Sequence, residues 1–213
     1  MRVESENGGL GAVEVERISR SAALVRGAVG AGALYGTWAV SPLVRRAFAQ
    51  GSMGDIDILN FALTLEYLEA AFYAEAAKRV PDLSGELAGY VKEFGESEQE
   101  HVDALTATIK DLGGKPVKAP GVDFGDAFSS QDAFLDLAIT LEDTGVSAYN
   151  GAAPMIESAE LLATAGAIVQ VEARHAAVVR NAAGEAAAPE AFDPTLTEDE
   201  VLKAVEPLIA SQS

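Results

Sequence analysis

Cysteine is absent from this 213-residue sequence, and histidine, tryptophan and basic residues are scarce. The lack of cysteine excludes disulfides, thiolate zinc sites and iron–sulfur clusters, so any bound metal must be held by oxygen and nitrogen atoms. Lys and Arg number 15 against 33 Asp and Glu, and residues 50–213 alone carry 29 acids against nine basic residues. An acidic surface of this kind repels phosphate backbones, so nucleic acid is not expected as a partner.

The first 49 residues differ from the rest in charge and hydropathy. They hold six Arg and four acids, a mildly apolar stretch from Ala22 to Val44, and the small-residue string Ala47-Phe48-Ala49. This layout predicts an export signal, and the string from Ser19 to Leu24 resembles a twin-arginine signal with one arginine missing. It would place the protein outside the cytoplasm or on the cell surface. The alternative is a retained N-terminal helical extension of a cytoplasmic protein, packed on the bundle or on a neighbouring subunit.

Four long segments of residues 50–213 have apolar residues at three- and four-residue spacing, which predicts amphipathic helices. Each is followed by a residue that ends helices, namely Pro81, Gly113, Pro154 or Gly184. The predicted helices span residues 55–79, 84–112, 131–152 and 158–183, and a shorter one spans 197–209.

Short polar signals mark two helix starts. Ser129, with Asp132 three residues later, is predicted to open the third helix, and Thr197 forms a capping box with Glu200 before the last. The connection 113–130 is long enough to run the length of a bundle. We therefore expect an all-α fold over residues 50–213, a four-helix bundle with a long crossover between its second and third helices and a short C-terminal helix.

Both histidines of the chain follow a glutamate by three residues, in the pairs Glu98/His101 and Glu172/His175. Residues three apart share one face of a helix, so the two side chains of each pair can reach one point in space. Each pair also lies among apolar residues of its helix. We therefore expect both pairs in the core of the bundle.

One further acid lies in the apolar stripe of each remaining helix, Glu66 in the first and Glu142 in the third. Four buried carboxylates are not tolerated without cations or protons to balance them. One Glu from each of two helices, with Glu-x-x-His from each of the other two, is the ligand pattern of di-iron and di-manganese bundles. The sequence therefore predicts a two-metal site formed by Glu66, Glu98, His101, Glu142, Glu172 and His175.

The two halves of the bundle repeat each other. Leu65-Glu66 with Tyr73 matches Leu141-Glu142 with Tyr149 at an offset of 76 residues. Gly145 stands where Glu69 would need its counterpart, so Glu66 rather than Glu69 is the predicted ligand. Glu69 and Glu100 are expected on solvated helix faces. Tyr73 and Tyr149 are either core tyrosines or residues that hydrogen-bond a ligand carboxylate or donate an electron.

Four strings carry a resemblance to a known family: ILNFALTLEYLEAAFY, HVDALTATIKDLGGKPV, LEDTGVSAYNGAAP and IVQVEARHAAVVR. They are similar to the ferritin-like superfamily, in its branch of bacterial ferritin-like and desiccation-related proteins, over residues 55–209. The resemblance implies that Glu66 and His101 bind one metal, that Glu142 and His175 bind the other, and that Glu98 and Glu172 bridge the two. It also implies two iron ions, with manganese as the alternative, and zinc is not excluded by ligand type.

The function implied is that of a redox enzyme, an oxidase, ferroxidase or peroxidase-like protein that consumes oxygen or peroxide and oxidises ferrous iron or another small reductant. One alternative is a non-enzymatic, stress-related or self-assembling protein that retains the metal as a folding element. In that case the N-terminal segment or the bundle faces would form a homo-oligomer. A further alternative is iron storage in a closed cage.

Overall fold

A computed structural model describes residues 54–83 and 85–210 of the chain. The predictions made for residues 1–49 lie outside the described residues. Over the described ranges the regular structure is helical, apart from one isolated antiparallel bridge between Val122 and Ile209. The expected all-α fold is therefore confirmed. The elements are α3 (Asp55–Arg79), α4 (Gly85–Asp111), α5 (Gln131–Ala152), η1 (Ala153–Met155), α6 (Ala159–Ala182), α7 (Glu198–Val205) and η2 (Glu206–Leu208).

Helix ends follow from local chemistry. Gly113 and Gly184 adopt φ of 76° and 80° and close α4 and α6, because glycine enters the left-handed region without steric penalty. Thr197 and Glu200 form the expected capping box of α7. The prediction for α5 was wrong by one residue: Ser130, not Ser129, is the cap, and its hydroxyl accepts a hydrogen bond from the backbone N–H of Ala133.

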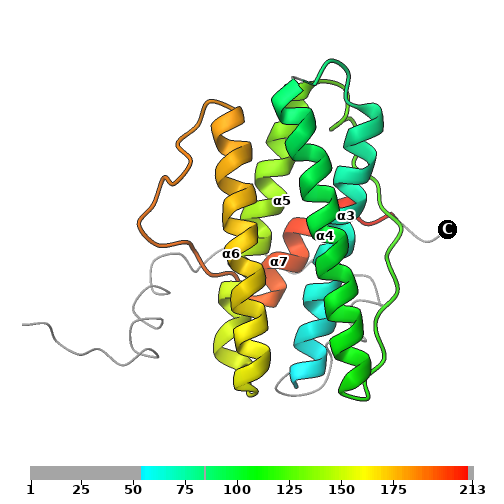
Figure 1. Cartoon of the computed structure of the whole chain (residues 1–213), viewed down its shortest axis with the longest axis vertical. Helices are drawn as coiled ribbons and strands as arrows, with labels where there is room; N and C mark the ends of the chain where they lie inside the picture. Colours follow the sequence, from blue (N-terminus) through cyan, green and yellow to red (C-terminus); the bar gives the residue numbers. More distant parts are fainter. Residues whose placement is uncertain (1–53, 84, 211–213) are drawn as a thin grey trace, which may run out of the picture. The chain divides into compact units, whose positions relative to one another are not determined.

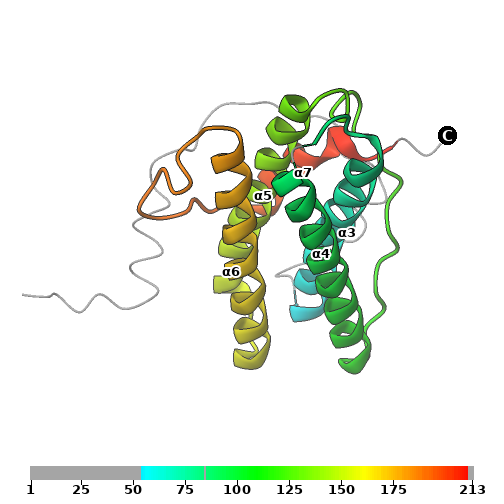
Figure 2. The same ribbon diagram turned by 45° about the horizontal axis from the view of Figure 1, so that its top comes forward.

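The four long helices form two hairpins, α3 with α4 and α5 with α6, that pack against each other (Figure 1). The connection between α4 and α5 runs along the side of the bundle, which makes α3 and α5 antiparallel (Figure 2). The short helix α7 packs on α3 and α5, and its Val201, Leu202 and Val205 belong to one apolar cluster with Leu65 and Ala148. None of the helices within the described ranges is both long and apolar enough to cross a membrane.

Two apolar clusters fill the interior of the bundle at different heights. One contains Phe72, Phe94 and Phe134, and Phe72 stacks on Phe134 with ring centroids 5.3 Å apart. The other contains Leu59 and Ile109. Along α3, the residues between these clusters include Glu66 and Glu69, so the bundle holds a layer of buried acids between two apolar layers.

The contact between α5 and the segment before α7 is tight enough to test. A Cβ atom at Gly151 would lie 2.0 Å from the carbonyl oxygen of Leu196, whereas one at Gly166 in α6 would meet nothing within 4 Å. Gly151→Ala should lower the free energy of unfolding by about 1–3 kcal/mol through overpacking. Gly166→Ala should raise it by roughly 0.5–1 kcal/mol because alanine favours the helix. Urea unfolding of both variants measures these changes. Equal changes in the free energy of unfolding for the two variants would contradict the close contact between Gly151 and Leu196.

Candidate metal centre

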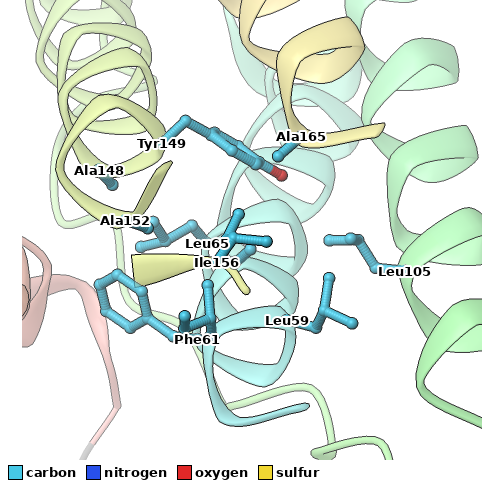
Figure 3. Close-up of a pocket in the computed structure, with 11 residues that line it drawn as sticks. Leu59, Phe61, Leu65, Leu105, Ala148, Tyr149, Ala152, Ile156 and Ala165 are labelled. Carbon is cyan, nitrogen blue, oxygen red and sulfur yellow. The ribbon is translucent and has the colours of Figure 1, made fainter. Parts of the chain in front are cut away.

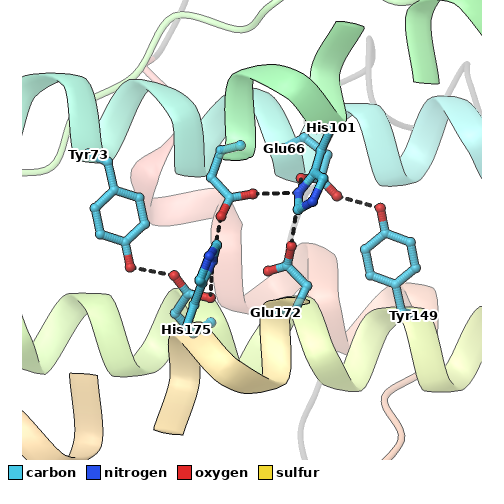
Figure 4. A network of polar contacts seen from close by, with 8 residues as sticks. Glu66, Tyr73, His101, Tyr149, Glu172 and His175 are labelled. Carbon is cyan, nitrogen blue, oxygen red and sulfur yellow. Dashed lines mark hydrogen bonds and ion pairs between the residues drawn. The ribbon is translucent and has the colours of Figure 1, made fainter. Parts of the chain in front are cut away.

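The six side chains singled out in the sequence converge at mid-height in the bundle (Figure 4). α3 and α5 contribute one glutamate each, and α4 and α6 each contribute a glutamate and a histidine one turn apart. All four carboxylates have no exposed surface, and the His175 side chain is 5% exposed against 12% for His101. The structure thus brings the predicted residues together, and their role as metal ligands stays a prediction. They are Glu66, Glu98, His101, Glu142, Glu172 and His175.

The six residues form two overlapping groups of four. In each group, one oxygen or nitrogen atom from every member lies within 4.8 Å of the others. Glu98 and Glu172 belong to both groups, whereas Glu66 and His101 belong only to the first, and Glu142 and His175 only to the second. Two ions that share two carboxylates would need this arrangement.

The histidines face the cluster through their Nδ1 atoms. His101 Nδ1 lies 2.9 Å from Glu98 Oε2 and 3.2 Å from Glu66 Oε2. His175 Nδ1 lies 2.7 Å from Glu98 Oε1, yet the two atoms are not aligned for a hydrogen bond. Atoms that are close without donor-to-acceptor alignment are suited to binding one ion together.

Several buried oxygens of the cluster have no hydrogen-bond donor among the described residues. They are Glu98 Oε1, Glu142 Oε2 and both carboxylate oxygens of Glu172. Leaving such atoms unpaired is strongly unfavourable, and no Lys or Arg of the described ranges pairs with these acids. Carboxylate oxygens and imidazole nitrogens are a donor set that iron and manganese accept, so the residues fit a pair of such ions.

Without metal, protons supply part of the missing positive charge. Burial, together with the charges of Glu66 and Glu98, raises the pKa of Glu172 to about 8. Burial also raises the pKa of Glu66 to about 7. For Glu98, burial alone would raise the pKa, but the two histidines outweigh it and lower the value to about 2. Burial alone would lower the pKa of His101, but contacts with three carboxylates, Glu172 first, raise it to about 12.

Two tyrosines hold the outer carboxylates of the cluster crosswise. The Tyr73 hydroxyl, on α3, donates to Glu142 on α5, and the Tyr149 hydroxyl, on α5, donates to Glu66 on α3 (Figure 4). Burial and the adjacent carboxylate raise the pKa of both tyrosines, so both remain protonated donors. One oxygen of each outer carboxylate therefore accepts a hydrogen bond from a tyrosine, and the other oxygen faces the cluster.

Glu69 was placed wrongly by sequence reasoning. It is 2% exposed rather than solvated, and burial followed by the charge of Glu172 raises its pKa well above the usual range. Glu100 is exposed, as expected. Glu69 lies one turn from Glu66 and three residues before the buried Phe72, and this helical spacing could have indicated its burial.

A small apolar cavity of about 20 Å³ lies beside the cluster, between α3, α4, α5 and α6 (Figure 3). Its lining side chains are hydrocarbon except for the hydroxyl of Tyr149, the tyrosine that bonds Glu66. A space of this size holds a single water-sized molecule. Its apolar walls suit an apolar diatomic gas better than water.

The family comparison agrees with this geometry. A model of the ferritin-like domain matches residues 54–185, which include α3, α4, α5 and α6 and all six residues of the cluster. The chain belongs to the ferritin-like domain family. No curated protein matches the sequence. The ferritin-like domain therefore carries a buried carboxylate and histidine cluster compatible with a two-metal site.

The protonated state of the metal-free domain can be tested through its pH dependence. Above about pH 5 the folded protein retains a proton on Glu66 up to about pH 7 and one on Glu172 up to about pH 8, both of which the unfolded chain has released. Because the folded state then binds more protons, the free energy of unfolding of chelator-treated protein should fall as pH rises, by about 1.4 kcal/mol per pH unit for each retained proton. Above pH 6.5 the folded protein also retains the proton of His101, so this residue likewise makes the free energy of unfolding fall as pH rises.

Urea unfolding at pH 5, 6, 7 and 8 measures this slope. Glu172→Gln should make this slope shallower by the contribution of about one retained proton, about 1.4 kcal/mol per pH unit. Glu100→Gln, on the exposed face, should leave the slope unchanged. A free energy of unfolding that rises over this range in wild-type protein would contradict the assignment.

Proposed function

We propose that this ferritin-like domain binds two metal ions, iron in the first place, and uses them as an oxidase of ferrous iron or another small reductant. The observation that carries the proposal is the pair of overlapping four-residue groups that share Glu98 and Glu172. Glu66 and His101 would hold one ion, and Glu142 and His175 the other. Manganese satisfies the same donor set and is the alternative metal.

When bound, such a metal pair supplies sites for oxygen or peroxide and passes electrons between reductant and oxidant. The net reaction oxidises two ferrous ions to ferric and reduces one dioxygen, with two protons, to hydrogen peroxide. The apolar layers above and below the cluster exclude water from it. The cavity beside Tyr149 supports dioxygen as the oxidant, because it offers an apolar space next to the Glu66 side of the site.

The residues of the chain would also handle protons. Metal binding requires the carboxylates in their charged form, so protons on Glu66 and Glu172 must leave as metal enters. Tyr73 and Tyr149 keep the two outer carboxylates oriented, since a hydrogen bond to one oxygen leaves the other directed at the cluster.

A non-enzymatic role rests on the same buried charge. Four carboxylates without exposed surface need protons or bound cations to balance their charge in the folded bundle, so a metal pair would stabilise the fold even without redox activity. Oxygen consumption after addition of ferrous salt separates the two roles. The enzyme consumes oxygen over many equivalents of iron, whereas a folding element binds metal and consumes none.

Metal content is the first test. Wild-type protein should bind about two manganous or ferrous ions per chain, and His101→Ala combined with His175→Ala should abolish both metal binding and oxygen consumption. Glu100→Gln serves as the control, since Glu100 lies beside His101 in the sequence but is exposed. Full oxygen consumption by metal-free protein would contradict an oxidase that depends on these ions.

The tyrosines give a second test. Tyr73→Phe and Tyr149→Phe each remove one hydrogen bond to an outer carboxylate, and each should weaken metal affinity by about 10–100-fold. Because Tyr73 bonds Glu142 and Tyr149 bonds Glu66, each variant should affect one ion of the pair more than the other. Competition with a chelator of known affinity measures this. Wild-type affinity in both variants would show that the hydroxyls do not orient ligands.

A further inference from the structure

Glu69 is buried in the bundle and has no cationic partner in the part of the chain that the structure describes. No Lys, Arg or His nitrogen within residues 54–83 and 85–210 forms an ion pair with its carboxylate. Its 2% exposure leaves little solvent to stabilise a charge. It is the fifth carboxylate of a layer in which, among the described residues, His101 and His175 are the only basic side chains paired with the other four.

Gly145 creates the space that Glu69 occupies. A Cβ atom at Gly145 would lie 3.0 Å from Glu69 Oε1 and 3.2 Å from Glu172 Oε2. The two oxygens therefore face the same small volume over the glycine. Glycine in the middle of a helix is unfavourable by about 1 kcal/mol relative to alanine, and at this position it leaves room for the carboxylates of Glu69 and Glu172.

The position of Glu69 along α3 places it between the two groups of the cluster. It lies one turn after Glu66, which belongs to the first group, and one turn before Tyr73, which bonds Glu142 of the second. Glu172, whose Oε2 it faces over Gly145, belongs to both groups. Glu69 belongs to neither group in this conformation, so ligation by Glu69 requires its side chain to turn toward Glu172, the neighbour that belongs to both.

We propose that Glu69 is a fifth carboxylate ligand of the metal pair, on the α3/α5 face, and that Gly145 provides the space for it. This inference rests on the proposed two-metal site and adds a seventh protein ligand to the six. It makes the site asymmetric although the two helical hairpins repeat each other: one hairpin supplies an extra acid, and the other supplies the space for it.

Manganous ion binding tests the inference, with free ion followed by its electron paramagnetic resonance signal. Chelator-treated wild type, Glu69→Gln and the exposed control Glu100→Gln are titrated under one condition. We expect wild type and Glu100→Gln to behave alike and Glu69→Gln to bind manganese about 10–100-fold more weakly. Glu69→Gln removes a buried acid, so the variant should fold at least as stably as wild type without metal.

Glu69→Asp separates ligation from simple charge. It keeps the negative charge but shortens the side chain by one methylene, so a ligand role predicts weakened binding close to that of Glu69→Gln. Binding equal to wild type in Glu69→Asp would overturn the proposal, because charge alone would then account for the effect.

Gly145→Ala provides an independent variant that leaves Glu69 intact. The added methyl group should displace the Glu69 carboxylate and also crowd Glu172 Oε2. Manganese binding should therefore weaken more in wild type than in the Glu69→Gln background, where only the effect on Glu172 remains. If Gly145→Ala weakened manganese binding by the same factor in wild type and in Glu69→Gln, Gly145 would not act through Glu69, and this part of the proposal would be contradicted. If wild type takes up no manganese, the two-metal proposal itself fails; if it binds two ions and Glu69→Gln binds them equally well, only the role of Glu69 is lost.

Discussion

The need to balance buried negative charge governs the rest of this structure. Four glutamates with no exposed surface, and a fifth with almost none, lie in one layer between two apolar clusters. The effective penalty of burying one uncompensated ion is several kcal/mol, and a whole domain is stable by only about 5–15 kcal/mol. The bundle therefore depends on protons or metal ions at its centre, and burial raises the pKa of Glu66 and of Glu172 in the direction that favours bound protons.

The two ends of the cluster differ despite the repeated hairpins. Phe94 stacks on His175 with ring centroids 3.9 Å apart, and His175 is nearly covered. His101 retains more exposed surface, and the cavity beside Tyr149 lies on the same side, because Tyr149 bonds Glu66 of the His101 group. Solvent and small molecules would therefore reach the Glu66/His101 half of the site first.

Much of this arrangement could be predicted from the sequence, because the relevant signals are local and periodic. The spacing of Glu98 and His101, repeated in Glu172 and His175, places each pair on one helix face. Proline and glycine mark where the helices end, and the offset of 76 residues relates Glu66 to Glu142. These signals determine which side chains share a core, and the structure brings those side chains together.

Other features depend on contacts between helices, which periodicity does not describe. Glu69 has no carboxylate counterpart in the repeat, where Gly145 stands instead, yet that glycine leaves the space into which Glu69 fits. The crosswise bonds of Tyr73 and Tyr149 follow from the antiparallel pairing of α3 and α5. Ser129 and Ser130 are adjacent and chemically identical, so the sequence alone does not tell which of them caps α5; in the structure it is Ser130.

An anomalous-scattering map of crystals soaked in manganous or ferrous salt tests the central claim most directly. We expect two peaks about 3.5–4 Å apart, enclosed by the four glutamates and two histidines, with Glu98 and Glu172 contacting both. Peaks confined to the acidic surface, with the buried carboxylates unchanged after soaking in excess metal, would contradict it.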